Sequence, residues 1–253
     1  MCGQCRPMPA GTLLVVAVVF ALAGFIKGVI GLGLPTISMA MLAIVMPPVE
    51  AAAILILPSL LTNIWQMMTG PSLWTVTRRI WSMMLAVCLG TWAGVGLMTG
   101  AHARYGTVLL GSSLVIYALT SLAAVRFKIS RAWEPFFGPL AGAVTGVITA
   151  ATGVFVIPAV PYLQAIRLEK EDLVQALGLS FTVSTIALAA NVAAAGQLNT
   201  SMAGPTLAAL AVACGGMWVG QSVRLRLSPE TFQRWFFVGL LLLGLYLAVR
   251  SIV

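Results

Sequence analysis

Charged side chains are scarce in this sequence: they make up 8% of its 253 residues, whereas hydrophobic side chains make up 60%. A soluble domain carries about a quarter charged residues, which cover its water-facing surface. Because that polar cover is missing, the composition excludes a soluble globular domain and indicates a polytopic membrane protein.

Acidic residues and histidine are scarcer still. Six Asp and Glu stand against fourteen Lys and Arg, and His102 is the one histidine of the chain. A His-Glu-x-x-His metalloenzyme, a Ser–His hydrolase or a zinc site each needs ligands or bases that are missing here. We therefore expect no enzymatic activity, no metal centre and no cofactor. The Cys2-x-x-Cys5 pair leaves a redox or metal role open for the N-terminal tail alone.

The formal charge of +8 does not indicate a nucleic-acid partner. The basic residues stand at the ends of apolar runs and form no basic patch interleaved with aromatic residues. Membrane lipid is the expected surroundings of this chain. We expect no cleavable signal peptide, because the first apolar run continues past the length of a signal-peptide core and lacks a small-x-small exit.

Long stretches without Asp, Glu, Lys or Arg fill the sequence between these charges. A helix needs about 20 apolar residues to cross a bilayer, and the runs are too long and too apolar for alternating barrel strands. The fold class is therefore all-α. We expect ten helical pieces, at about residues 10–30, 34–46, 50–70, 79–99, 104–125, 134–151, 154–166, 171–195, 201–222 and 230–252.

The two halves of the chain resemble one another. GFIKGVI, at residues 24–30, aligns with GAVTGVI at 142–148, and EAAAILILPSL, at 50–60, aligns with EDLVQALGLSF at 171–181. The offsets of 118 and 121 residues agree if three residues are inserted between the blocks. We predict two related halves, at residues 1–128 and 129–253, with five helical pieces each.

The second piece of each half is too short to span the hydrocarbon, so pieces one and two are broken or re-entrant segments near residues 31–36 and 149–158. If both pieces cross, or if they form a re-entrant hairpin, each half makes an odd number of crossings and the second half is inverted. One kinked span would instead give parallel halves. The odd model places ten loop cations on one side and three on the other, against seven and six for the alternative. The positive-inside rule favours the odd model, with both termini outside the cytoplasm.

Inverted halves with broken helices are typical of secondary transporters, which bind substrate near the midplane. The first break, KGVIGLGLPT at residues 27–36, combines flexible glycines, a proline suited to a helix start and a cation one turn away. N–H groups at a helix start attract anions. Lys27 has an alternative interpretation, in which its side chain snorkels so that the ammonium group reaches the membrane interface.

Two segments also resemble a known family. GFIKGVIGLGLPTISMAMLAIVMPPVEAAAILILPSLLTNIWQM, at 24–67, looks like the first-half signature of the TauE/SafE family of membrane permeases, the sulfite exporters. GPLAGAVTGVITAATGVFVIPAVPYLQA, at 138–165, resembles its second-half counterpart. The resemblance implies a permease of the bacterial inner membrane for sulfite, sulfoacetate and related sulfonates. The glycine run of the first break is sparser than in the family, and the second break, at 149–153, holds one glycine.

Taken together, these features predict that a small anion binds between the two breaks and that the halves expose it alternately to each side. The expected substrate-binding residues are Lys27, Gly31, Gly33, Thr36, Asn63, Gln66, Thr149, Thr152, Gly153, Ser180, Ser184 and Asn191. Asn63, Gln66 and Asn191 have an alternative role as bridges between helices. Each hydroxyl has an alternative partner in its own helix backbone.

The sequence leaves open both the coupling ion and the functional class of the protein. Anion export from a negative-inside cell is electrically downhill, whereas uptake needs a coupling ion, a proton or sodium. Glu50 and Glu171 are the candidate proton carriers, and both positions also suit acids that stabilise a helix N-terminus. An anion channel shares the same helix-end chemistry, and a non-transporting membrane scaffold or assembly protein is the third class.

Overall fold

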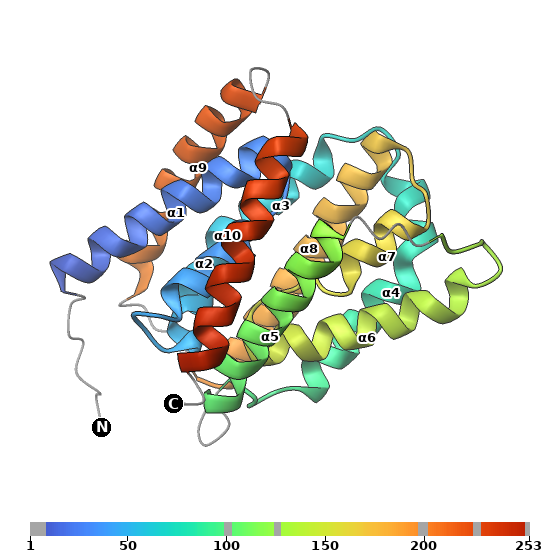
Figure 1. The fold of residues 1–253 in the computed structure, drawn as a ribbon. Coiled ribbons are helices and arrows are strands. Elements are labelled where there is room, and N and C mark those ends of the chain that lie inside the picture. Colours follow the sequence, from blue (N-terminus) through green and yellow to red (C-terminus); the bar gives the residue numbers. More distant parts are fainter. Residues whose placement is uncertain (1–8, 99–102, 124–127, 197–201, 225–228, 251–253) are drawn as a thin grey trace.

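The computed structural model describes residues 9–98, 103–123, 128–196, 202–224 and 229–250, and every regular element in these ranges is a helix (Figure 1). The predictions on Cys2, Cys5 and His102 concern residues outside these ranges. The first half contains α1 (Ala10–Ile30), α2 (Leu34–Leu42), α3 (Pro48–Met68), α4 (Leu73–Ala93) and α5 (Ala103–Leu122). The second half contains α6 (Glu134–Thr152), α7 (Ala159–Ala165), α8 (Lys170–Ala194), α9 (Ala203–Arg224) and α10 (Pro229–Arg250).

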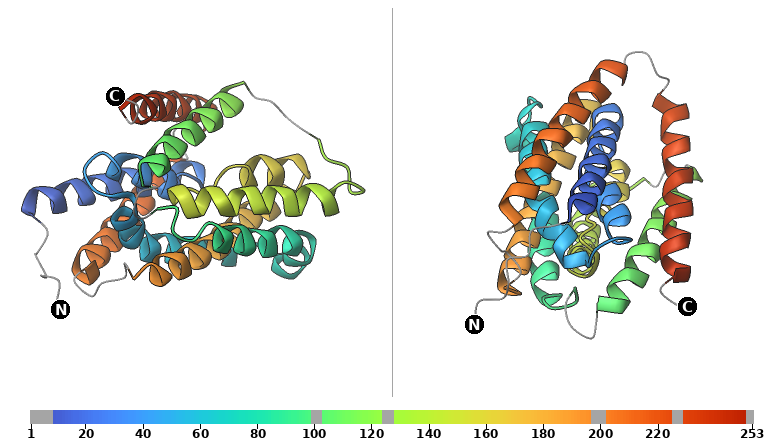
Figure 2. Two further views of the ribbon diagram at one scale, coloured as in Figure 1. Left: turned by 90° about the horizontal axis from the view of Figure 1, so that it is seen from below. Right: turned by 90° about the vertical axis from the view of Figure 1, so that its left-hand side faces the viewer.

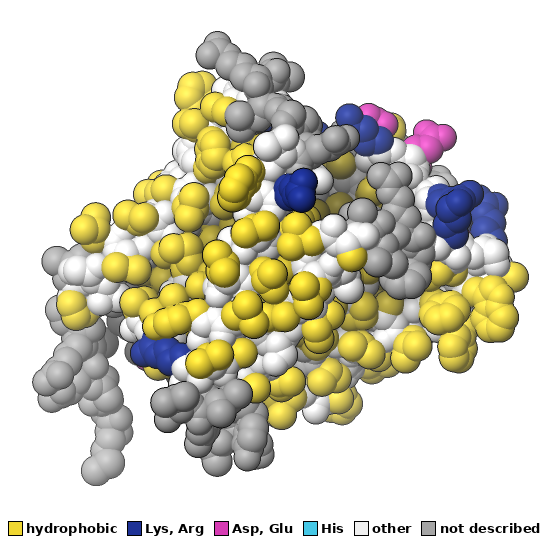
Figure 3. All heavy atoms as spheres, in the orientation of Figure 1, with side chains coloured by type: hydrophobic (Ala, Val, Ile, Leu, Met, Phe, Trp, Pro, Cys, Tyr) yellow, Lys and Arg dark blue, Asp and Glu magenta, His cyan; other side chains and the backbone are white. Residues whose placement is uncertain are grey.

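Six helices within the described ranges are long and apolar enough to cross a membrane: Gly11–Ile30, Pro48–Met68, Glu134–Thr152, Lys170–Ala194, Ala203–Arg224 and Thr231–Arg250. Hydrophobic side chains cover much of the surface drawn in Figure 3. The described tryptophans are all exposed. The all-helical, multi-pass membrane architecture expected from the sequence is therefore present.

The expected bounds of three helices were wrong. α4 begins six residues before the expected range of 79–99 and ends six residues before its end. The helix starts after the turn formers Gly70-Pro71-Ser72, and the Arg78-Arg79 pair lies inside it rather than before it. α2 ends at Leu42 instead of 46, and α7 begins at Ala159 instead of 154. Pro158 disfavours the helical conformation at Ile157, the residue before it, so α7 begins only after Pro158.

Each long helix packs against a helix of the other half: α1 on α9, α6 on α4, α3 on α8, and α5 on α10. Exchanging α1–α5 with α6–α10 converts the first pair into the second and leaves the other two unchanged. Figure 2 shows α5 and α10 together on one side of the bundle. The short α2 and α7 carry mostly buried side chains and pack against the longer helices.

Glycines set the close approach at the first two of these interfaces. A Cβ added at Gly24 on α1 would lie 2.2 Å from the carbonyl oxygen of Ala213 on α9. One added at Gly142 on α6 would lie 2.2 Å from that of Met83 on α4. Gly28 and Gly146 make matching approaches one turn further on, so both Gly-x-x-x-Gly pairs are packing faces.

The equivalent helices α3 and α8 run antiparallel. Gly70, just after α3, lies against Gln175 near the start of α8, whereas Asn63 bonds to Thr185 further along α8. Two inverted halves would produce this orientation, and the division at residues 128 and 129 stays a prediction.

Candidate functional site

The first break lies between α1 and α2 and depends on two glycines. Gly31 has a φ of 83° and Gly33 a φ of 107°, a region that side chains disfavour. The Gly31 N–H still donates to the carbonyl oxygen of Lys27 at 2.7 Å, which closes the last turn of α1. α2 then starts at Leu34 with Pro35 in its first turn. The structure therefore contains the break that the sequence predicts.

The second break follows α6 and depends on one glycine and one hydroxyl. Gly153 has a φ of 71°, and the Thr152 hydroxyl accepts the N–H of Val154 at 3.1 Å. A Cβ added at Gly153 would lie 2.8 Å from the terminal methyl of Met39 on α2. The second break thus lies directly against the short helix of the first half.

Lys27 is buried inside the bundle, with 4% of its surface exposed. Its ammonium group donates to the Thr62 hydroxyl at 3.0 Å and to the side-chain oxygen of Asn63, both on α3. The snorkelling alternative is therefore not what the structure shows. The one acid–base ion pair recorded among the described residues joins Arg79 and Glu134, so no described carboxylate pairs with Lys27, and its recorded hydrogen-bond partners are neutral oxygens.

Asn63 connects this lysine to the second half. Its amide nitrogen donates to the Thr185 hydroxyl on α8 at 3.3 Å, and Thr185 follows Ser184 in the chain. The chain of contacts Lys27–Asn63–Thr185 therefore links α1, α3 and α8 where α3 crosses α8.

Several buried polar atoms near these elements have no hydrogen-bond partner among the described residues. Leaving such an atom unpaired costs about 1–3 kcal/mol, so it remains available to bind a ligand. The six atoms lie on α2, α3 and α8: Thr36 Oγ1, Ser38 Oγ, Ser59 Oγ, Gln66 Oε1, Ser180 Oγ and Ser184 Oγ. All except those of Ser38 and Ser59 belong to predicted site residues.

Other predicted site residues have their donors occupied. Gln66 donates to the Val174 carbonyl at 3.2 Å, and Asn191 donates to the Thr91 carbonyl at 3.2 Å, so both bridge helices. The hydroxyls of Thr149 and Thr152 donate to backbone carbonyls of α6, each at 2.7 Å. An anion would have to displace these bonds before it could use those groups.

Sequence reasoning missed four residues of this region: Ser38, Ser59, Thr62 and Thr185. A signal existed for Ser59, because the repeat alignment pairs it with Ser180 and both hydroxyls lack partners. Thr62 and Thr185 stand next to Asn63 and Ser184 in the chain. Glu50 and Glu171 lie in the first turns of α3 and α8, the positions where the helix dipole favours acids.

The site is closed in this structure. Thr36, Asn63 and Ser184 have no exposed surface, so no space as large as a water molecule touches their side chains. Entry of an anion therefore requires the surrounding helices to move.

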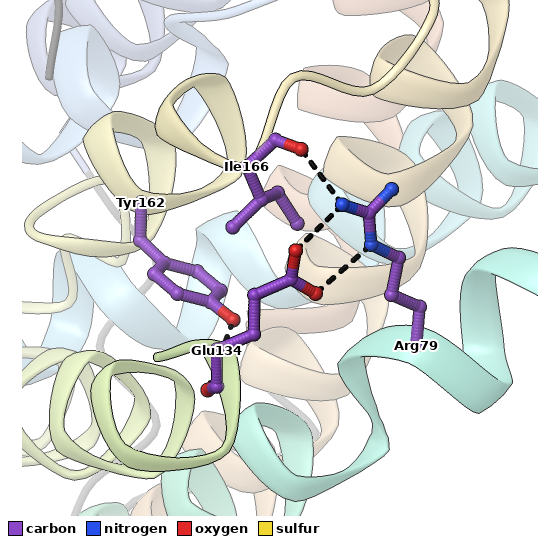
Figure 4. A network of polar contacts seen from close by, with 4 residues as sticks. All are labelled: Arg79, Glu134, Tyr162 and Ile166. Atoms are coloured by element: carbon purple, nitrogen blue, oxygen red, sulfur yellow. Dashed lines mark hydrogen bonds and ion pairs between the residues drawn. The ribbon is translucent and has the colours of Figure 1, made fainter. Parts of the chain in front are cut away.

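A second polar cluster lies between α4, α6 and the end of α7 (Figure 4). Arg79 makes two hydrogen bonds to the Glu134 carboxylate, at 3.0 and 2.7 Å, and one to the Ile166 carbonyl at 2.8 Å. The Tyr162 hydroxyl donates to the Glu134 carbonyl at 3.5 Å. This cluster fastens the two halves to each other.

The fold and the buried cation define a class, a multi-pass helical membrane protein with a polar centre beside interrupted helices. The family model described as "Sulfite exporter TauE/SafE" matches residues 16–247. Because this match spans most of the chain, the protein belongs to the TauE/SafE family of membrane anion exporters. Neither the comparison with curated proteins nor that with solved structures found a match.

Proposed function

We propose that this protein is a secondary transporter that moves small organic or sulfur-containing anions, such as sulfite, sulfoacetate or other sulfonates, across the bacterial inner membrane by alternating access. The observation that carries the proposal is the buried Lys27 ammonium group, held by neutral oxygens one turn before the first break. Membership in the TauE/SafE family supports the anionic substrate class.

The chemistry of the site favours an anion over a cation. A buried ammonium group is costly unless an opposite charge accompanies it, and Lys27 has three N–H donors for the two oxygens that it contacts. A sulfite or sulfonate group would balance that charge. The unpartnered hydroxyls of Thr36, Ser180 and Ser184 would supply further donors.

Closure of the site supports alternating access over a permanently open pore. The proposed moving parts are the two halves, 1–128 and 129–253, related by inversion. Two observations support this inversion. The α1–α9 pair of one half corresponds to the α6–α4 pair of the other, and the equivalent helices α3 and α8 run antiparallel. Such a pair of equivalent arrangements gives two states of similar energy that open to opposite sides.

The loop charges support a topology with both termini outside the cytoplasm. In that orientation export of an anion runs down the electrical gradient without a coupling ion. Uptake would require a proton or sodium.

Purified protein in liposomes tests this proposal. Sulfite, sulfoacetate and taurine are supplied outside, with acetate as a carboxylate control, and accumulation is followed with and without a pH gradient. We expect saturable uptake of at least one sulfur-containing anion and exchange against the same anion loaded inside. Failure to move any of them under every gradient would contradict transport and favour a scaffold, whereas single-channel current would identify a channel.

A matched pair of variants links the flux to the site. Lys27→Met removes the buried cation, and Lys170→Met makes the same change at an exposed lysine. We expect transport to fall at least tenfold in the first and to remain in the second. Normal flux in Lys27→Met would remove Lys27 from the mechanism.

A further inference from the structure

One face of α4 has the pattern of a surface that contacts lipid. Its exposed large residues recur every three or four positions, which places them on one stripe: Trp74, Arg78, Trp81, Leu85, Leu89 and Trp92. Trp74 is 77% exposed and Trp92 is 76% exposed. They are 18 residues apart, about 27 Å of helix, close to the roughly 30 Å of a hydrocarbon core. α4 is not one of the six helices that length and hydropathy alone mark as spans. Indole rings favour the depth of a membrane interface, so the spacing of the two tryptophans is consistent with α4 crossing the bilayer between them.

Arg78 is the exception on this stripe. It lies one turn inside Trp74, with its side chain exposed rather than packed in the bundle. A guanidinium group on a lipid-facing stripe needs a negative partner at headgroup depth.

A cavity of about 850 Å³ opens beside Arg78, between α4 and the start of α6. Its lining combines aromatic, hydroxyl and basic side chains, including Trp74, Arg78, Trp81, Ser82, Arg131 and Pro135. Arg79 also reaches it, but Glu134 neutralises that charge. Arg78 and Arg131 have no acidic partner recorded among the described residues, so the cavity wall carries net positive charge.

The positive charge extends beyond this cavity. A second cavity of about 440 Å³ adjoins the Arg79–Glu134 pair and is lined by Lys128, Arg131 and Arg167. Figure 3 shows Lys and Arg side chains gathered at this end of the molecule, next to large hydrophobic side chains and with Asp and Glu side chains above them. Exposed Trp133, just before α6, and exposed Phe136 on α6 supply further aromatic surface there.

We propose that the cavity beside Arg78 binds the headgroup of an anionic phospholipid. Its phosphate lies between the guanidinium groups of Arg78 and Arg131, where Arg makes strong, charge-assisted hydrogen bonds. The indoles of Trp74 and Trp81 flank the glycerol, and the acyl chains follow Leu85 and Leu89 along α4. The aromatic flanks and the lipid-facing stripe favour a lipid over a soluble phosphate, because a soluble anion gains nothing from them.

Native mass spectrometry of the full chain, supplied with equal phosphatidylglycerol and phosphatidylcholine, tests the proposal. We expect wild type to retain phosphatidylglycerol preferentially. Near an anionic membrane surface each arginine contributes about fivefold. Arg78→Gln and Arg131→Gln should each reduce the preference by about that factor, and the double variant by about 25-fold.

Controls separate this site from general attraction. Arg224→Gln removes an exposed arginine from the end of α9, outside both cavities, and should leave the preference unchanged. Equal selectivity in wild type and the double variant would overturn the proposal. A second arm adds excess inorganic phosphate: we expect retained lipid to stay bound, and its displacement would identify a site for soluble anions and also overturn the proposal.

Discussion

Lys27 on α1 and Asn63 on α3 share a direct hydrogen bond, in which the ammonium group donates to the amide oxygen. The nitrogen of the same amide donates to Thr185 on α8. This second bond fixes the orientation of the amide, so that its oxygen rather than its nitrogen faces the lysine. Asn63 therefore holds the cation in place without cancelling its charge, which an anion-binding site requires.

Replacing that amide with a carboxylate tests the idea. Asn63→Asp has nearly the same shape but places a negative charge against Lys27, so the protein supplies its own anion. An ion pair in a buried site is strong enough to exclude a competing anion. We expect anion flux in liposomes to fall by about tenfold or more. The new ion pair offsets the lost hydrogen bond from the amide to Thr185, so thermal stability in detergent should change little.

The control for this change is Gln233→Glu, which converts an exposed amide on α10 into an acid. It should transport normally. Full flux in Asn63→Asp would mean that substrate does not depend on an uncompensated Lys27 charge.

Two neighbouring glycines on α9 test the close approach of the helices. A Cβ at Gly216 would lie 2.3 Å from the Ala21 carbonyl oxygen, whereas nothing lies within 4 Å of one at Gly215. Gly216→Ala should force α1 and α9 apart and cost about 1–3 kcal/mol, a fall of about 2–12 °C in Tm. Gly215→Ala should be neutral or slightly stabilising, because Ala favours a helix. Equal Tm values for the two variants would contradict this packing.

The sequence predicted the features that depend on local chemistry. Apolar runs set the spans, and Gly31, Gly33 and Gly153 set the breaks, because glycine adopts the positive φ found at each break without the steric cost that a side chain adds. The predicted start of α4 was wrong because Arg78 and Arg79 were interpreted as the helix boundary. The residues that mark the boundary are the turn formers at Gly70–Ser72. Charge marks where a helix meets water and does not by itself end the helix.

Partnerships between distant residues were not predictable in the same way. Asn63, Gln66 and Asn191 are equivalent in sequence terms, each an amide in an apolar span. Only the packing of α3 against α1 and α8 decides that Asn63 meets Lys27, whereas Gln66 bonds to the backbone of α8. The Arg79–Glu134 pair joins residues 55 apart, and no local pattern signals it.

That pair provides a test of how the halves are fastened. Arg79 makes bidentate contact with Glu134 and also donates a hydrogen bond to the carbonyl oxygen of Ile166, the residue that follows α7. Arg79→Gln should cost about 1–3 kcal/mol, because charge-assisted bonds are lost and Glu134 remains partly buried. The measurement is thermal unfolding in detergent, with Arg224→Gln as the neutral control. A double-mutant cycle with Glu134→Gln should show coupling, and purely additive effects would exclude a direct pairing.

The orientation of the halves is open to a labelling experiment at equivalent helix ends. Thr69 follows α3, and Ala194 ends α8; both are exposed. In a background without the four native cysteines, Thr69→Cys and Ala194→Cys are treated with a membrane-impermeant maleimide. Inverted halves with the proposed charge distribution place Ala194 outside and Thr69 inside the cell. Ala194→Cys should therefore react in intact cells, and Thr69→Cys only after permeabilisation. Reaction of both from the same side would require parallel halves, and the reverse pattern would place the termini in the cytoplasm.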